Sequence, residues 1–142
     1  QQSDRQRHCG SKKDMELTLD THALVWYLDK SLNNKLSQKA LKAIQEAEGS
    51  YTIYIPIIVL MEILYLVEKG RINLSFPKLL LTLEESMNYR IVSFDTRLLK
   101  IAETIKGMEA HDRLIMATAL LTGSPLVSND KEIHAKGIKV IW

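Results

Sequence analysis

The sequence LTLDTHALVWYL, residues 17–28, decides the fold class. Its start belongs to a short apolar strand, expected over residues 16–19, that ends at Asp20. Residues 21–28 continue as a short apolar helix. We therefore expect a buried strand that leads directly into a helix, with a carboxylate at the junction.

The same alternation of strand and helix continues along the chain. Further strands are expected at residues 51–55, 89–93, 126–127 and 139–141. Helices are expected at residues 38–48, 57–69, 76–87, 96–106 and 113–122, with one helical turn at 130–135. The strands are short and apolar without alternation, which is typical of a sheet covered on both faces. The pattern predicts an α/β fold with a mostly parallel sheet.

Local signals mark the ends of the expected helices. Ser37 and Asp95 are interpreted as N-caps, because a short side-chain oxygen can accept a hydrogen bond from the first helical turn. Gly49 and Gly123 are expected to end the helices at 38–48 and 113–122.

Composition limits the class of protein. The chain has 142 residues, of which 46% are hydrophobic and 25% charged, as in an ordinary globular domain. A single cysteine excludes an intramolecular disulfide framework. The sequence contains no run of 18 apolar residues, so no membrane span is predicted, and its first residues lack a signal-peptide pattern. We expect a cytoplasmic protein.

The net positive charge of the chain comes from its first residues. Residues 1–14 carry a net charge of +2, and residues 15–142 have a net charge of zero. We expect this polar leader to be disordered and to be an artificial or upstream addition, because Met15 reads like a natural start. Residues 15–142 form the expected single domain. Since that domain has no overall attraction for nucleic acid, such a role requires a local site.

Glu62 is the most informative single residue. It lies in the apolar helical stretch IIVLMEILYLV, without a polar neighbour in sequence. A buried ionised carboxylate costs several kcal/mol, in order of magnitude, unless it is paired or binds a metal. The alternative is that Glu62 reaches solvent at a helix edge or pairs with a lysine or arginine.

Three aspartates join Glu62 as candidate ligands. Asp20 and Asp130 each follow an expected strand, and Asp112 stands at the expected start of a helix. Ligands of open parallel sheets bind at the carboxyl ends of the strands. Each aspartate alone could be only a helix cap or a turn residue. The four together form an all-oxygen set, which suits magnesium or manganese better than zinc. Asp95 also follows a strand, but we interpret it as a cap.

Four motifs together resemble the PIN-domain family, and within it the VapC toxins of bacterial and archaeal toxin–antitoxin pairs. They are LDTHAL, the isolated glutamate in PIIVLMEI, HDRLIMATAL, and LVSNDKEI. The resemblance extends over residues 15–142. It implies a PIN-like three-layer fold whose parallel five-stranded sheet has the order 3-2-1-4-5, flanked by helices. That order would bring the first and fourth strands together and leave Asp95 at the edge.

The resemblance also implies an activity, namely a magnesium- or manganese-dependent endoribonuclease that leaves a 5′-phosphate and a 3′-hydroxyl. The family's catalytic and metal-binding acids correspond to Asp20, Glu62, Asp112 and Asp130, and Ser128 corresponds to the hydroxyl residue near the last acid. The implied partners are an RNA substrate, a small antitoxin that lies in a groove and blocks the acids, and a second copy of the chain. The apolar helix at residues 76–87 could support that homodimer.

Two other functions remain open from the residues. One is a PIN-like nuclease that acts on DNA flaps or in RNA processing outside a toxin pair. The other is a non-catalytic α/β interaction module, whose acids only cap helices. If the chain is a nuclease, Arg113 and Lys131 are candidate phosphate contacts, because each adjoins a proposed ligand. The alternative is that they are surface charges or charges that face the antitoxin.

Overall fold

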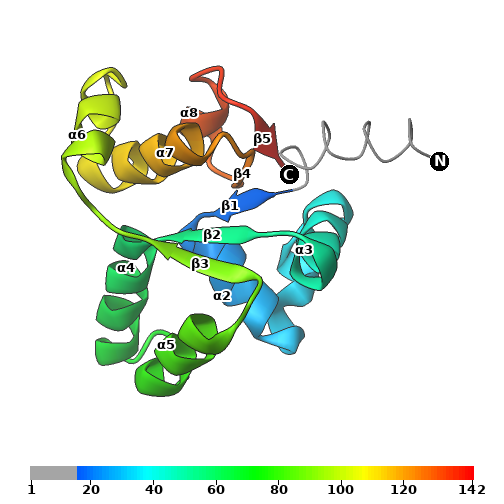
Figure 1. The fold of residues 1–142 in the computed structure, drawn as a ribbon. Helices are drawn as coiled ribbons and strands as arrows, with labels where there is room; N and C mark the ends of the chain where they lie inside the picture. Colours follow the sequence, from blue (N-terminus) through cyan, green and yellow to red (C-terminus); the bar gives the residue numbers. More distant parts are fainter. Residues whose placement is uncertain (1–15) are drawn as a thin grey trace.

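A computed structural model describes residues 16–142, and the predicted leader at 1–14 lies outside the described residues. Five strands form one parallel sheet in the order β3-β2-β1-β4-β5, which confirms the expected topology (Figure 1). The strands are β1 (Leu17–Leu19), β2 (Ile53–Pro56), β3 (Tyr89–Val92), β4 (Leu126–Val127) and β5 (Val140–Ile141).

Helices cover both faces of this sheet. Figure 1 shows α6 and α7 on one side, and α2, α4 and α5 on the other, so that three layers result. The helices are α2 (Thr21–Leu28), α3 (Gln38–Ser50), α4 (Ile57–Glu68), α5 (Phe76–Glu85), α6 (Thr96–Glu103), α7 (Ala110–Thr122) and α8 (Lys131–His134). A short 3₁₀ helix, η1 (Lys30–Lys35), follows α2.

The central strand β1 is buried along its whole length. It pairs with β2 on one side, where Leu17 lies opposite Ile53, and with β4 on the other, where Leu19 lies opposite Val127. Its one polar side chain, Thr18, is buried but shares a 2.7 Å hydrogen bond with the Ser124 hydroxyl, which offsets the cost of its burial. The carboxyl ends of β1 and β4 therefore lie side by side, where parallel sheets bind their ligands.

Side-chain caps start the helices directly after the strands. Asp20 accepts a hydrogen bond from the backbone N–H of Ala23 at 2.9 Å, and Asp130 accepts one from Glu132 N–H at 2.8 Å. Asp95 caps α6 in the same way, as predicted. Gly123 ends α7, also as predicted, in the left-handed conformation at φ +65° that favours glycine.

Helix α7 begins earlier than the sequence suggested. Its first residue is Ala110 rather than Arg113, because Glu109 is the N-cap and accepts a hydrogen bond from Asp112 N–H at 2.9 Å. The alternative interpretation of Asp112 as a cap is therefore wrong, since this residue lies inside the first helical turn.

One further expectation fails at the end of a helix. Helix α3 passes through Gly49 and ends at Ser50, because the N–H of Tyr51 still bonds to the carbonyl of Ala47 at 2.8 Å. The short helix η1, which Asp29 caps through the Ser31 N–H, was not expected from the sequence. In the described part of the chain, no helix is both long and apolar enough to cross a membrane.

Candidate functional site

A cleft of about 320 Å³ opens at the carboxyl ends of β1 and β4, and all four predicted acids line it. Asp20 follows β1, Asp130 follows β4, Asp112 lies in the first turn of α7, and Glu62 lies in the middle of α4. Four segments that are distant in sequence thus bring their carboxylates to one place. We call this site the acid cleft.

Asp20 is the acid that burial affects most clearly. Burial raises the pKa of its carboxyl above the usual value, and the nearby Asp130 charge raises it further. Hydrogen bonds from the Ser128 hydroxyl and the Ala23 N–H favour the charged form and oppose this rise in pKa. Ser128 is fully buried, and its hydroxyl also accepts a hydrogen bond from Asp130 N–H at 3.1 Å. It therefore connects the two aspartates that follow β1 and β4.

Glu62 reaches the cleft from α4 and is half-buried. The Thr21 hydroxyl donates a 2.7 Å hydrogen bond to Glu62 Oε1 and fixes the direction of the carboxylate. No lysine or arginine among residues 16–142 forms an ion pair with it. The alternative of a cation-paired glutamate therefore does not hold within the described residues.

Asp112 shows that the acids interact electrostatically. Its pKa rises to about 6, first because of burial and then because of the charges of Asp130, Glu109, Glu62 and Asp20. Like charges disfavour ionisation, so the part of the rise in pKa that burial does not cause reflects the negative charges of the neighbouring acids.

The donor chemistry of the acid cleft fits a hard divalent cation. Carboxylate oxygens are the ligands that magnesium and manganese prefer, and the two ion pairs among the described residues, Arg97–Asp95 and His111–Glu109, involve none of the four acids. Within residues 16–142, there is no group of three or more aspartate, glutamate, histidine or cysteine side chains that is already arranged to hold a metal ion. A metal-binding role for the four acids is thus a proposal, based on donor type and charge.

Asp95 lies outside the acid cleft. It pairs with Arg97 at 3.0 Å and accepts a hydrogen bond from Leu98 N–H. The hydrogen bond from Leu98 N–H, and after it the contacts with Arg97, lower the pKa of Asp95. The pKa values of Asp20 and Asp112 are raised instead.

Sequence reasoning missed the aromatic wall of the acid cleft. His22, Trp26 and Trp142 line it together with Thr21, Asn129 and Ile115. The ring centroids of His22 and Trp26 are 5.3 Å apart, and those of Trp26 and Trp142 are 6.0 Å apart. His22 and Trp26 are four residues apart on the helix that Asp20 caps, so they share one face of it. This spacing in the sequence could have predicted that both rings lie beside Asp20.

The two candidate phosphate contacts do not line the acid cleft. Arg113 lines a separate cleft between α6 and α7, beside Phe94 and Leu99. Lys131 begins α8 and is exposed.

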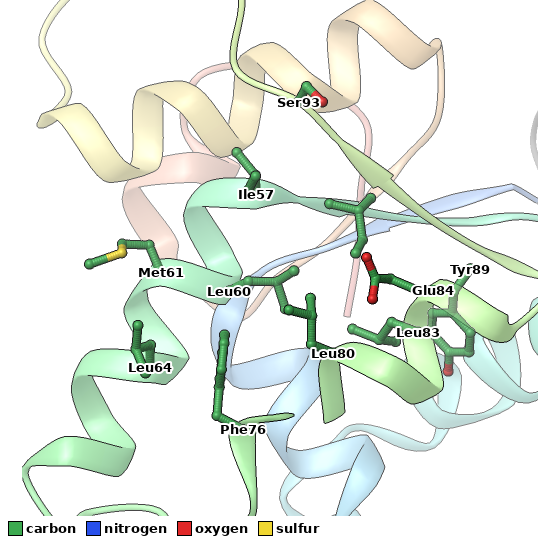
Figure 2. Close-up of a pocket in the computed structure, with 11 residues that line it drawn as sticks. Ile57, Leu60, Met61, Leu64, Phe76, Leu80, Leu83, Glu84, Tyr89 and Ser93 are labelled. Atoms are coloured by element: carbon green, nitrogen blue, oxygen red, sulfur yellow. The ribbon is translucent and has the colours of Figure 1, made fainter. Parts of the chain in front are cut away.

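Another cleft, of about 660 Å³, lies between α4, α5 and β3 (Figure 2). Its lining is mostly apolar, with Leu60, Phe76 and Leu80 close to one another, and Glu84 is its single carboxylate. It therefore lacks a cluster of acids.

Carboxylates that gather where the central strands of a three-layer parallel α/β domain end lie at the position where such sheets bind their ligands. The chain belongs to the PIN domain family, whose sequence profile matches residues 17–139. No curated protein matches the chain in sequence.

The solved structures that share the fold include the following three. VapBC2 from Rickettsia felis, bound to a DNA fragment from its promoter, aligns with a TM-score of 0.64 at 18% identity, over 88% of this chain and 96% of that one. A toxin–antitoxin complex from Klebsiella pneumoniae aligns with a TM-score of 0.61 at 14% identity, over 89% and 96%. FitAB bound to the IR36 DNA fragment aligns with a TM-score of 0.51 at 18% identity, over 87% and 92%.

Proposed function

We propose that this chain is a metal-dependent endoribonuclease and the toxin of a toxin–antitoxin pair. The observation that carries the proposal is the acid cleft, where four carboxylates from distant segments share one opening and none of them forms an ion pair with a lysine or arginine among the described residues. Membership of the PIN domain family and the likeness in fold to two toxin–antitoxin structures support it.

Each acid has a proposed role in hydrolysis of the phosphodiester bond. Asp20, Glu62 and Asp112 would hold the principal divalent ion, directly or through water. Asp130 would complete the site by holding a second ion or by orienting the attacking water. Ser128 would keep Asp20 and Asp130 in place through its hydrogen bonds to both. When bound, magnesium or manganese would lower the pKa of water and neutralise charge at the phosphate.

The proposed partners follow from the same function. A toxin nuclease in the cytoplasm needs an inhibitor, so we expect an antitoxin protein that covers the acid cleft. A second copy of this chain is the expected homodimer partner. Large apolar side chains that are more than two-fifths exposed support such an interface, for example Met61 at 57% and Leu81 at 54%.

The test compares two aspartates that occupy equivalent positions in the fold. Asp20 and Asp95 each follow a parallel strand and cap the next helix, but only Asp20 lines the acid cleft. We expect Asp20→Asn to abolish manganese-dependent cleavage of a structured RNA, and Asp95→Asn to leave it nearly unchanged. Circular dichroism would show that both variants fold. Equal cleavage by the wild type and Asp20→Asn would mean a contaminating nuclease and would refute the proposal.

A further inference from the structure

We propose that a groove adjoining the acid cleft binds a single-stranded RNA on one side of the bond to be cut. This inference rests on the proposed nuclease function. The groove has a volume of about 780 Å³ and lies between α2, η1 and the segment that follows α4. Its cationic lining residues are Lys30, Lys35 and Arg71, and we call it the basic groove.

The basic groove adjoins the acid cleft. His22 and Trp26, on consecutive turns of α2, line both. A polymer whose phosphate reaches the acids can therefore continue into the basic groove without leaving the protein surface.

Charge explains why a substrate needs this second surface. The acid cleft gathers four carboxylates, which repel the phosphates that neighbour the scissile one. The basic groove has the opposite balance, because its three cations face one carboxylate, that of Asp29. The Asp29 carboxylate already accepts hydrogen bonds from the backbone N–H and the hydroxyl of Ser31. The cations remain available for phosphate, and no ion pair between described residues involves them.

Other cations near the acid cleft are less well placed. Arg113 lines the cleft between α6 and α7 instead. Lys136 donates a 2.6 Å hydrogen bond to the carbonyl of Lys106. Lys131 lines neither the acid cleft nor the basic groove. Among residues 16–142, the basic groove is thus the cationic surface that shares lining residues with the acid cleft.

The rest of the groove suits unpaired bases. Its apolar lining offers surface for bases and ribose rings, and comprises Val25, Leu28, Leu32, Leu66, Ile72 and Leu74. Trp26 is half-buried at the junction, with Lys35 Nζ 5.8 Å from its ring centroid. Single-stranded nucleic acid binds through this combination of aromatic stacking and cations along the backbone, whereas paired bases do not expose their faces.

The first experiment separates binding of the strand from the chemistry. The variant Lys30→Ala/Lys35→Ala/Arg71→Ala is compared with Lys39→Ala/Lys78→Ala/Lys100→Ala, which removes three exposed lysines that line neither the acid cleft nor the basic groove. Both are assayed in manganese on a single-stranded RNA of about 20 nucleotides and on a dinucleotide. We expect KM for the long RNA to rise by about tenfold or more in the groove variant alone. Cleavage of the dinucleotide should be unchanged in the control variant, and the groove variant should lose much less on the dinucleotide than on the long RNA.

The second experiment measures binding without cleavage. The protein has two tryptophans, and both line the acid cleft, so Trp142→Phe leaves Trp26 as the single indole reporter. Titration of this variant with the long RNA under chelator should quench its fluorescence. Adding the three groove substitutions should weaken binding and make the slope of log K against log salt shallower by about two, as for three lost phosphate contacts on a single strand.

The outcomes distinguish the two proposals. If the wild type cleaves neither RNA, the proposed nuclease function fails, and the fluorescence titration still decides whether the groove binds RNA. If the groove variant binds and cleaves the long RNA like the wild type, the groove proposal is overturned, and a protein segment becomes the better occupant. An equal loss on the long RNA and the dinucleotide would also overturn it, since the substitutions would then act on the acids themselves.

Discussion

The Thr21 hydroxyl donates a 2.7 Å hydrogen bond to Glu62 Oε1 and so joins the first turn of α2 to the middle of α4. Thr21 directly follows Asp20, the cap of the same helix. One short segment after β1 therefore supplies one carboxylate of the acid cleft and orients a second. The apolar surroundings of Glu62 in sequence indicated an unusual glutamate, and this contact accounts for its position.

Thr21 should act as a positioning residue. Thr21→Val keeps the side-chain shape but removes the donor to Glu62. A hydrogen bond to a charged group contributes about 1.5–3 kcal/mol, so we expect kcat for RNA cleavage to fall by about 10- to 100-fold. Thr21→Ser should recover most of the activity, and Thr82→Val, an exposed site on α5, should have no effect. Wild-type kcat in Thr21→Val would show that the contact does not matter for cleavage.

The pKa of Asp112 predicts a pH dependence of stability without added metal. Its folded-state pKa of about 6 exceeds the unfolded value of 3.8, so the folded protein retains a proton that the unfolded chain releases. The resulting stabilisation is complete below about pH 4 and is lost as pH rises through 6. Asp112→Asn should flatten this part of the curve. At pH 7 it should be more stable than the wild type by about 1 kcal/mol, after allowance for solvent screening of a half-exposed group.

Urea unfolding at several pH values, in the presence of chelator, measures this effect. Asp95→Asn is the control with the opposite sign, because the pKa of Asp95 is lowered. Its charged form stabilises the folded state above about pH 4, so its removal should reduce stability at neutral pH. A wild-type curve that rises between pH 4 and 6 and is unaffected by Asp112→Asn would contradict the assignment.

Manganese should raise the melting temperature. A ligand that binds only the folded state contributes about 2.7 kcal/mol at a concentration 100 times its Kd, which corresponds to about 5 °C or more for a domain of this size. We expect this shift in the wild type and in Asp95→Asn, and a much smaller one in Glu62→Gln. Differential scanning fluorimetry with millimolar manganese and with chelator measures it. A full shift in Glu62→Gln would remove that residue from the proposed ligands.

A different carboxylate should matter for stability alone. Glu48 accepts a 2.6 Å hydrogen bond from Tyr27 and a 2.7 Å hydrogen bond from Tyr89, and so links α2, α3 and β3. Tyr89→Phe should therefore lower the free energy of unfolding by about 1 kcal/mol, with RNA cleavage unchanged. Urea titration checks the first part and the nuclease assay the second. A loss of cleavage at unchanged stability would point to an unexpected link with the acid cleft.

The α/β alternation of the fold and the set of four candidate acids follow from patterns in the sequence itself. Apolar strands that end in Asp20 and Asp130 specify where those carboxylates lie, because parallel strands share one carboxyl edge. The strand order came from the resemblance rather than from the residues. Asp112 was expected at a helix start and is found in a first turn, but the cap, Glu109, was missed. Several residues could serve as caps, and hydrogen bonding decides among them only in three dimensions.

The aromatic wall and the basic groove are harder to predict because both depend on contacts between distant residues. A tryptophan in an apolar helix predicts a packing role, which suits the half-buried state of Trp26 but not its position between two clefts. Arg71 joins Lys30 and Lys35 only through the packing of α4 against α2. No local pattern in the sequence connects them.

The caps at Asp20 and Asp130 have a consequence for how the enzyme is handled. Backbone N–H groups of α2 and α8 already hold these carboxylates, so their placement relies on the peptide chain rather than on an added ion. Dialysis against a chelator should leave the protein folded, and restoring the cation should return full turnover without a refolding delay. Purified protein can thus be stored inactive without the cation, and its activity can be started at a chosen moment by adding the cation to the buffer.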